Sequence, residues 1–345
     1  VLSISILGLF LTIKQTLKPT HGMWSTNLKI VGFDLPVAVP SLIWMTTTPW
    51  IAPLFSGVHI GTTLGTMILK WDHSEKKLNI VCSPCKFSSS TFGKGGLPVE
   101  KMTITLMRDK ANLIGQVIID NIAASWSGYL SSNSIVAKIV LPMTPIKEIY
   151  NIWPGLIPEV RYASIYGNLS VVASVNLPEG QLEISPKVID FSVDGLRTGP
   201  LLMGGGVCTQ ERRSKRALLE KSYIARAVVA AEDPNFFKHD GYSIYEFIDF
   251  DIANSAKLSN VLNQSSITQK LARIVFTDND QSPVHKLREL LYVMELERTL
   301  SKSRILGLYL NNAPWGADIC GAESAAKYYF KVRARHLDVT QAIWL

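Results

Sequence analysis

The chain is poor in charged residues, and this shortage limits what the protein binds. Only 18% of its 345 residues are charged, against 47% that are hydrophobic, and the net charge of +7 is spread over the whole length. The dense basic run Arg212–Arg216 is interpreted as a solvated linker. Neither half of the chain has a composition that predicts a polyanion-binding face, so nucleic acid is excluded as a partner.

Cysteine is also scarce, and the four cysteines decide little. Cys82 and Cys85 have Cys-x-x-Cys spacing, but no second Cys or His pair lies nearby to complete a zinc site. Two alternatives stay open for this pair, namely a local disulfide in a periplasmic domain and two free thiols. No other feature of the sequence identifies a metal site.

Apolar runs long enough to cross a membrane are missing. Val1–Ile13 is nearly all apolar, but it is shorter than the about 20 residues that a spanning helix needs. We interpret residues 1–20 as the remnant of a membrane anchor or signal, with a buried helix as the alternative. The chain stops at Leu345 within an apolar helical pattern, which predicts that the last domain is incomplete.

Two hydrophobic periods divide the rest of the chain and predict an α+β protein. Residues 21–203 are predicted to form an antiparallel β-rich envelope domain of unknown role, because apolar and polar residues alternate in short runs between turn signals. Residues 204–216, which begin with three glycines, are predicted to be a linker. From residue 217 to 345 the period is helical, so the second domain is predicted to be mainly α.

Ala230–Gly241 is the segment with the strongest chemical signature. It contains two adjacent carboxylates, two aromatic rings, a histidine and a glycine. Glu232 and Asp233 directly follow the apolar run Ala227–Ala231, where desolvation is expected to raise the pKa of Glu232 and make it a general base. Taken alone, a solvated helix-end carboxylate is the alternative.

Three further blocks follow in order, at Ser265–Gln269, His285–Glu289 and Gly321–Phe330. Together with Glu-Asp-x-x-Phe-x-x-His-x-Gly at residues 232–241, they resemble the peptidoglycan glycosyltransferases. This family comprises the monofunctional transglycosylases and the transglycosylase domain of class A penicillin-binding proteins. The resemblance covers roughly residues 214–345 and implies a lysozyme-like, mainly α glycosyltransferase domain.

The resemblance implies a transferase that joins lipid II into glycan strands. The acceptor sugar hydroxyl attacks the anomeric carbon of a chain that is attached to undecaprenyl pyrophosphate. Glu232 is expected to take the hydroxyl proton, and Glu289 to orient the groups that bind the leaving pyrophosphate. The residues expected to bind substrate are Asp233, Phe236, His239, Ser265, Thr268, Gln269, Lys286, Lys302, Arg304 and Asn311.

The resemblance also implies a location and partners. The expected location is the bacterial inner membrane, with the catalytic domain on the periplasmic side and cell-wall synthesis proteins as partners. A divalent cation, Mg or Mn, is often used near the pyrophosphate in this family, and Asp233 or Glu289 would lie near it.

Several residues depart from the family pattern. Asn263 and Gln264 replace a pair of small residues, His285 replaces an arginine, and Lys270 replaces a second glutamine. Ile274 and Gly307 are also unusual. These changes predict weaker binding of the donor. Two alternatives to the transferase stay open, a non-catalytic envelope scaffold and a lysozyme-like peptidoglycan hydrolase that uses the same carboxylates.

Overall fold

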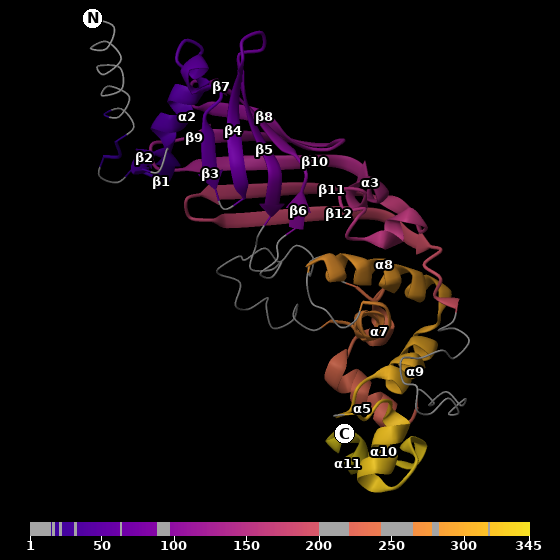
Figure 1. The fold of residues 1–345 in the computed structure, drawn as a ribbon. Coiled ribbons are helices and arrows are strands. Elements are labelled where there is room, and N and C mark those ends of the chain that lie inside the picture. Colours follow the sequence, from indigo (N-terminus) through magenta and orange to yellow (C-terminus); the bar gives the residue numbers. More distant parts are fainter. Residues whose placement is uncertain are drawn as a thin grey trace, which may run out of the picture. The chain divides into compact units, whose positions relative to one another are not determined.

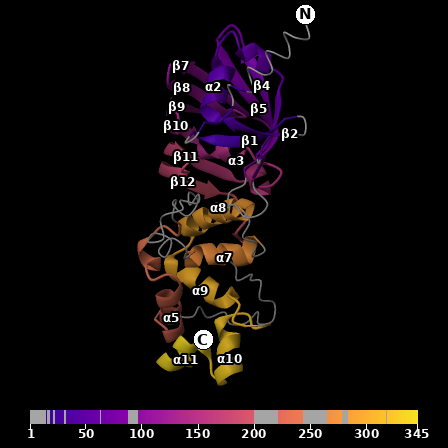
Figure 2. The same cartoon turned by 90° about the vertical axis from the view of Figure 1, so that its left-hand side faces the viewer.

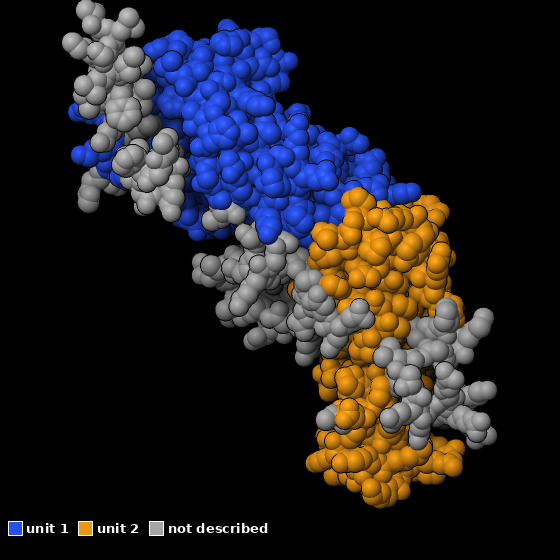
Figure 3. Space-filling model, in the orientation of Figure 1, with its two compact units in different colours: residues 1–153, 168–189, 250–252 blue, residues 154–167, 190–249, 253–345 orange. Residues whose placement is uncertain are grey.

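The computed structural model describes residues 15, 18–20, 23–30, 33–62, 64–87, 97–199, 221–242, 265–277, 283–316 and 318–345. Its contacts divide the chain into two compact units, which are treated separately below (Figure 3). Unit 1 comprises residues 1–153, 168–189 and 250–252, and unit 2 comprises residues 154–167, 190–249 and 253–345.

The unit boundaries differ in one respect from the domains that the sequence predicts. Residues 154–167 and 190–199 were placed in the β-rich domain, but they are grouped with the helices of unit 2. The predicted anchor, residues 1–20, lies almost wholly outside the described residues, and the predicted linker, residues 204–216, lies wholly outside them.

Unit 1 is built on a large antiparallel sheet, as the alternating pattern predicts (Figure 1). The strand order is β12-β11-β10-β9-β8-β7-β5-β4-β3, with β6 paired to β5, and a separate hairpin joins β1 to β2. The strands are β1 Ser25–Ile30, β2 Phe33–Ala38, β3 His59–Thr62, β4 Gly65–Asp72, β5 Lys77–Phe87, β6 Leu97–Val99, β7 Met102–Asp109, β8 Asn112–Ile119, β9 Ile122–Leu130, β10 Ile135–Pro145, β11 Ser164–Leu177 and β12 Gln181–Asp194.

Period-2 patterning produces this sheet because alternate side chains point to opposite faces. One face packs Leu78, Leu106 and Leu113 against Ala52 of the 3-10 helix η1 (Ala52–Phe55). Helix α2 (Val39–Thr47) adds Ile43 to the same cluster. Burying each of the leucines stabilises the fold by about 2 kcal/mol, which is enough to fix which face of each strand is inside.

Cys82 and Cys85 form a disulfide within β5. The structure therefore selects the first of the two alternatives that the sequence left open. Both sulfurs are buried together with Val99 and Met102, so the bridge is part of the second hydrophobic cluster of unit 1.

Unit 2 is mainly helical, as predicted, and α7 packs against both α8 and α9 (Figure 2). Serine side chains begin three of the helices: Ser222 at α5, Ser266 at α7 and Ser301 at α9 each accept a main-chain N–H of the first turn. The helices are α5 Tyr223–Glu232, α7 Ile267–Phe276, α8 Pro283–Thr299, α9 Lys302–Asn312, α10 Ala322–Phe330 and α11 Val339–Trp344, with 3-10 turns η3 Pro158–Arg161, η4 Phe236–Lys238 and η6 Ala334–His336. Helix α3, Ile146–Tyr150, belongs to unit 1.

Two segments of unit 2, residues 154–167 and 190–199, make polar contacts with one side of α8. The Glu159 carboxylate, 1% exposed, accepts from Arg288 Nε (2.8 Å) and from Tyr292 Oη (3.2 Å). One turn further along α8, Glu295 accepts from the main-chain N–H of Leu196 (2.7 Å) and from Thr198 Oγ1 (2.7 Å). These buried hydrogen bonds explain why the flanking segments group with the helices and not with the sheet.

No helix among the described residues is long and apolar enough to cross a membrane.

Candidate active site

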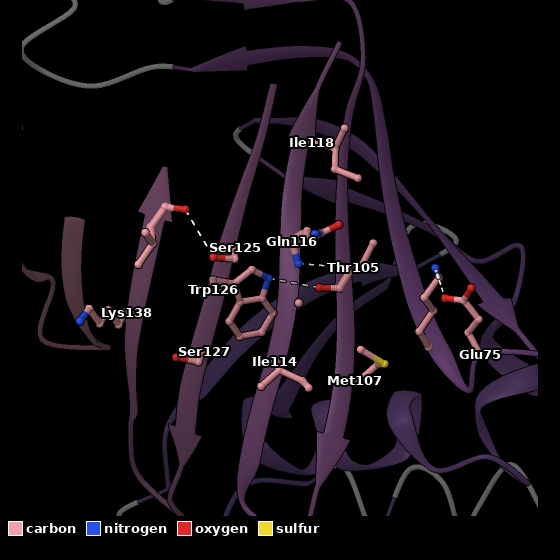
Figure 4. A pocket seen from close by; sticks show the side chains of 13 residues that line it. Glu75, Thr105, Met107, Ile114, Gln116, Ile118, Ser125, Trp126, Ser127 and Lys138 are labelled. Carbon is pink, nitrogen blue, oxygen red and sulfur yellow. Dashed lines mark hydrogen bonds and ion pairs between the residues drawn. The ribbon is translucent and has the colours of Figure 1, made fainter. Parts of the chain in front are cut away.

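Unit 1 contains a groove on the sheet, with a volume of about 520 Å³ (Figure 4). Trp126 crosses β8 at Gly115, where a Cβ atom would lie 2.7 Å from Trp126 Nε1, and the indole donates to Thr105 O (3.2 Å). Glu75 is the carboxylate in the groove lining, and it is paired with Lys77. The groove therefore lacks the two carboxylates that the sequence predicts for catalysis, and the candidate active site lies in unit 2.

Glu232 is the last residue of α5, and its side chain is 42% exposed. The apolar residues before it end the helix without burying the carboxylate, contrary to the desolvation that the sequence predicts. Lys270 of α7 donates to Glu232 Oε2 and lies 3.5 Å from its main-chain oxygen. Tyr309 of α9 is close enough that burial and the Glu232 charge raise its pKa to about 12. Glu232 is thus a reachable carboxylate beside a cation.

Asp233 organises the loop after α5 by hydrogen bonding. His239 Nδ1 accepts the N–H of Gly241 (2.9 Å), so Nε2 must be the protonated nitrogen that donates to Asp233 Oδ1 (2.8 Å). Asp233 also accepts the N–H of Ile267 (3.1 Å), the first residue of α7. These bonds tie the Glu232 loop to the start of α7.

Gly241 is required where it stands. Its φ is +83°, and a Cβ atom there would lie 2.2 Å from Glu297 Oε1. Phe236, also in this loop, is fully buried, with Lys302 Nζ 4.6 Å from its ring centroid.

The hydroxyl and amide block begins α7 and is mostly committed to structure. Ser266 and Gln269 form a capping box in which each side chain accepts the other residue's main-chain N–H (3.0 and 2.7 Å). Thr268 is fully buried and donates to Glu297. Ser265 is only partly buried and accepts from Arg273 Nη2 (3.1 Å). Of the three predicted donors to substrate, Ser265 is the one with an exposed surface.

Glu297 of α8 is a site residue that the sequence analysis missed. Its Oε1 accepts from Thr268 Oγ1 and from Lys302 Nζ (2.8 Å), so it joins α7, α8 and α9. The signal that could have identified it is the absence of a Cβ at Gly241, which makes room for this carboxylate.

Glu289 differs from Glu232 in nearly every respect. It is 2% exposed, and Arg273 donates to both carboxylate oxygens, from Nε (2.8 Å) and from Nη2 (3.3 Å). Burial raises the pKa of Glu289, while the hydrogen bond and charge of Arg273 and the charge of Lys286 oppose the rise. Lys286 therefore acts on Glu289 through its charge, but the direct partner is Arg273.

Helix α7 links the two carboxylates. Lys270 and Arg273 are three residues apart and therefore neighbours on the helix surface. Lys270 contacts Glu232 of α5, and Arg273 contacts Glu289 of α8. Neither cation was among the residues predicted for the site.

Two predicted residues lie at opposite ends of α9. Arg304 is in the first turn, where its N–H donates to Ser301 Oγ (3.3 Å). Asn311 is in the last turn, and its main-chain oxygen faces Gly321, where a Cβ atom would lie 2.8 Å away. The two residues are about two turns apart on the helix. Asn263 and Gln264, named as departures from the family pattern, lie outside the described residues.

Comparison with known proteins supports the assignment of the candidate active site to unit 2. Residues 208–345 match the family model described as transglycosylase. The C-terminal part of this chain is therefore similar to the transglycosylase family. Below, residues 208–345 are called the transglycosylase segment.

Curated relatives agree with this assignment. The chain is 40% identical over 119 residues to the biosynthetic peptidoglycan transglycosylase of Paraburkholderia xenovorans, covering 34% of this chain and 50% of the relative. The Nitrosospira multiformis protein of the same name is 36% identical over 126 residues, covering 35% and 52%. The chain thus spans about half the length of the curated relatives that it matches.

Proposed function

We propose that this protein is a peptidoglycan glycosyltransferase that polymerises lipid II into glycan strands. The observation on which this proposal depends is the pair of carboxylates within the transglycosylase segment, one reachable and one buried, joined by α7. A lysozyme-like arrangement of the helices is part of the proposal.

Glu232 is the general base in this mechanism. The acceptor 4-hydroxyl oxygen forms a bond to the anomeric carbon of the donor, its proton passes to Glu232, and the bond from that carbon to the pyrophosphate oxygen breaks. Exposure of 42% allows the hydroxyl to reach Glu232, whereas the 2% exposure of Glu289 does not. Glu289 instead orients Arg273, and through Lys286 it helps to form the cationic side of the site.

Lys286, Lys302 and Arg304 are proposed to stabilise the leaving pyrophosphate. Lys302 is 20% exposed and already bonded to Glu297, which fixes the ammonium group over Phe236. Preorganised cations of this kind lower the barrier because they need not reorient as charge develops. Asp233, His239, Thr268 and Gln269 support the site by holding the Glu232 loop and the start of α7.

A divalent cation fits this arrangement poorly. Asp233 is engaged by His239 and by the N–H of Ile267, and Glu289 is engaged by Arg273. The described residues contain no group of three or more His, Cys, Asp and Glu side chains that could hold a metal ion. We therefore derive no step through a metal. Dependence of polymerisation on Mg or Mn, measured with and without a chelator, tests the family expectation.

The inner membrane, with the site on its periplasmic side, is the proposed location because the substrate is lipid-linked. Membrane lipid and other cell-wall synthesis proteins are the proposed partners. Fractionation of cells that express the full-length protein tests the location.

Incubation of the purified protein with labelled lipid II tests the activity. We expect glycan polymer from the wild type and a loss of at least ~100-fold in rate for Glu232→Gln, the range for removing a general base. Absence of polymer from the wild type, under conditions where a biosynthetic transglycosylase works, rejects the proposal. Solubilised fragments from finished cell wall would favour the hydrolase instead, and lipid II binding without turnover would favour the scaffold.

A further inference from the structure

Lys270 is the departure from the family pattern that the structure places in direct contact with the proposed base. The resembled pattern has glutamine at this position, which has no charge. Here the ammonium group forms an ion pair with Glu232 Oε2, and its side chain is 22% exposed. The same nitrogen lies 3.5 Å from the main-chain oxygen of Glu232, so it contacts the end of α5 at two points.

The other groups around Glu232 do not duplicate this charge. Helices α9 and α11 and the turn η6 pack against α5. Tyr309 of α9 is protonated at neutral pH because its pKa is raised to about 12, and α11 has no charged residue within its bounds. In η6, Arg335 Nε donates to His336 Nε2 (3.1 Å). The adjacent carboxylate, Asp233, is bonded to His239. The cation in direct contact with Glu232 comes from another helix: it is Lys270 of α7.

We propose that Lys270 is a positioning residue that holds the Glu232 carboxylate in place before the acceptor binds. This inference rests on the proposed function. A glutamate at a helix end, 42% exposed, has several rotamers available, and the ion pair with the Lys270 ammonium group limits them.

Lys270 takes no part in the bond changes. When the hydroxyl proton reaches Glu232, the ion pair with Lys270 is lost. A neutral glutamine at position 270 could not form this ion pair.

Kinetics of Lys270→Gln and Lys270→Arg against lipid II test the inference. At neutral pH we expect Lys270→Gln to lower kcat by about 2- to 5-fold, the factor that corresponds to a partly exposed ion pair, with KM nearly unchanged. Lys270→Arg, which keeps the charge, should recover most of kcat. Lys77→Gln removes the lysine of a Lys–Glu pair in unit 1 and serves as the matched control.

An arginine variant no better than the glutamine variant, or a loss that appears in KM and not in kcat, would overturn the inference. A second measurement does not depend on activity. In a double-mutant cycle of urea unfolding, Lys270→Gln should lower the midpoint in the wild-type background but not in the Glu232→Gln background. Equal shifts in both backgrounds reject the role of Lys270. If the wild type makes no polymer, the proposed function fails, and this cycle still decides whether the pair exists.

Discussion

The surroundings of Glu232 and Glu289 show how one helix can give two carboxylates opposite properties. Both lie within the transglycosylase segment, and both are paired with a cation of α7. Glu232 is at a helix end, 42% exposed, opposite a flexible lysine. Glu289 is in the middle of α8, 2% exposed, and an arginine fork binds both of its oxygens. Glu232 is therefore accessible to a substrate, whereas Glu289 is buried and held in one position by Arg273.

The choice of cation fits each environment. Arginine binds a carboxylate with two parallel hydrogen bonds and suits a permanent, buried pair. Lysine is a point charge on a flexible stem, so its partner can be given up when a substrate arrives. These differences support the proposal that Glu232 takes part in the chemical step and that Glu289 gives structural support.

The largest effect is expected from removing the arginine. Arg273→Met leaves the Glu289 charge buried without its partner, which should lower the free energy of unfolding by about 3–5 kcal/mol. Urea unfolding followed by circular dichroism measures it. Arg298→Met is the matched control, since that arginine pairs with Asp194 where both side chains are more than 40% exposed; it should cost less than about 1 kcal/mol. Similar losses for the two variants would break the comparison.

A neighbouring face of α8 should be nearly as sensitive. Glu159→Leu leaves Arg288 and Tyr292 without their buried acceptor, and we expect a loss of about 3 kcal/mol in unfolding free energy. The double variant Glu159→Leu/Arg288→Met removes both charges and should recover much of the loss. A double variant that is no more stable than Glu159→Leu would show that packing, and not the unpaired charge, determines the cost.

A smaller effect is expected in the pH dependence of stability. Burial raises the pKa of Glu289 above its ordinary value of 4.5, so the unfolded chain loses this proton at lower pH than the folded protein. The contribution of this group to stability is complete below 4.5 and is lost as the pH rises through the raised pKa. Urea midpoints of the wild type and Glu289→Gln, measured across this range, should differ in slope, with the wild type falling more steeply. A wild-type midpoint that rises with pH relative to that of Glu289→Gln would mean that Arg273 outweighs burial.

The smallest effect on stability is expected at Glu232. Glu232→Gln removes an ion pair that is largely open to solvent, so its unfolding free energy should change by less than about 1 kcal/mol even though its activity is lost. Thermal unfolding of this variant, beside the rate of polymerisation, measures both quantities. A stability loss equal to that of Glu289→Gln would erase the distinction between the two carboxylates.

Much of the fold could be predicted from sequence, because local periods report which faces are buried. The alternation of apolar and polar residues within residues 21–203 predicts strands, and β7 and β11 lie in this range; the helical period from residue 217 onward predicts the helices of unit 2. The grouping of residues 154–167 with the helices could not be predicted in this way. It depends on the contact of Glu159 with Arg288 and Tyr292, which are more than 120 residues away.

The candidate site shows the same division. The order of motifs identified Glu232, Asp233, His239 and Glu289, and the structure places Asp233 and His239 in one hydrogen-bonded loop. The sequence did not identify Lys270 and Arg273 as the partners of the two carboxylates. Both cations lie on α7, and the spacing of the motifs on α5 and α8 does not depend on residues of a third helix. Glu297 was missed for the same reason.

The sequence by itself determined the residue types of this protein's chemistry and the faces that its strands and helices bury, since both depend on neighbours within a few positions. Tertiary structure decided which carboxylate is exposed and which is buried. It also decided that Lys270 and Arg273, one turn apart on α7, meet Glu232 and Glu289 respectively. Exposure and charge pairing depend on how helices pack, and packing brings together residues that no local pattern connects.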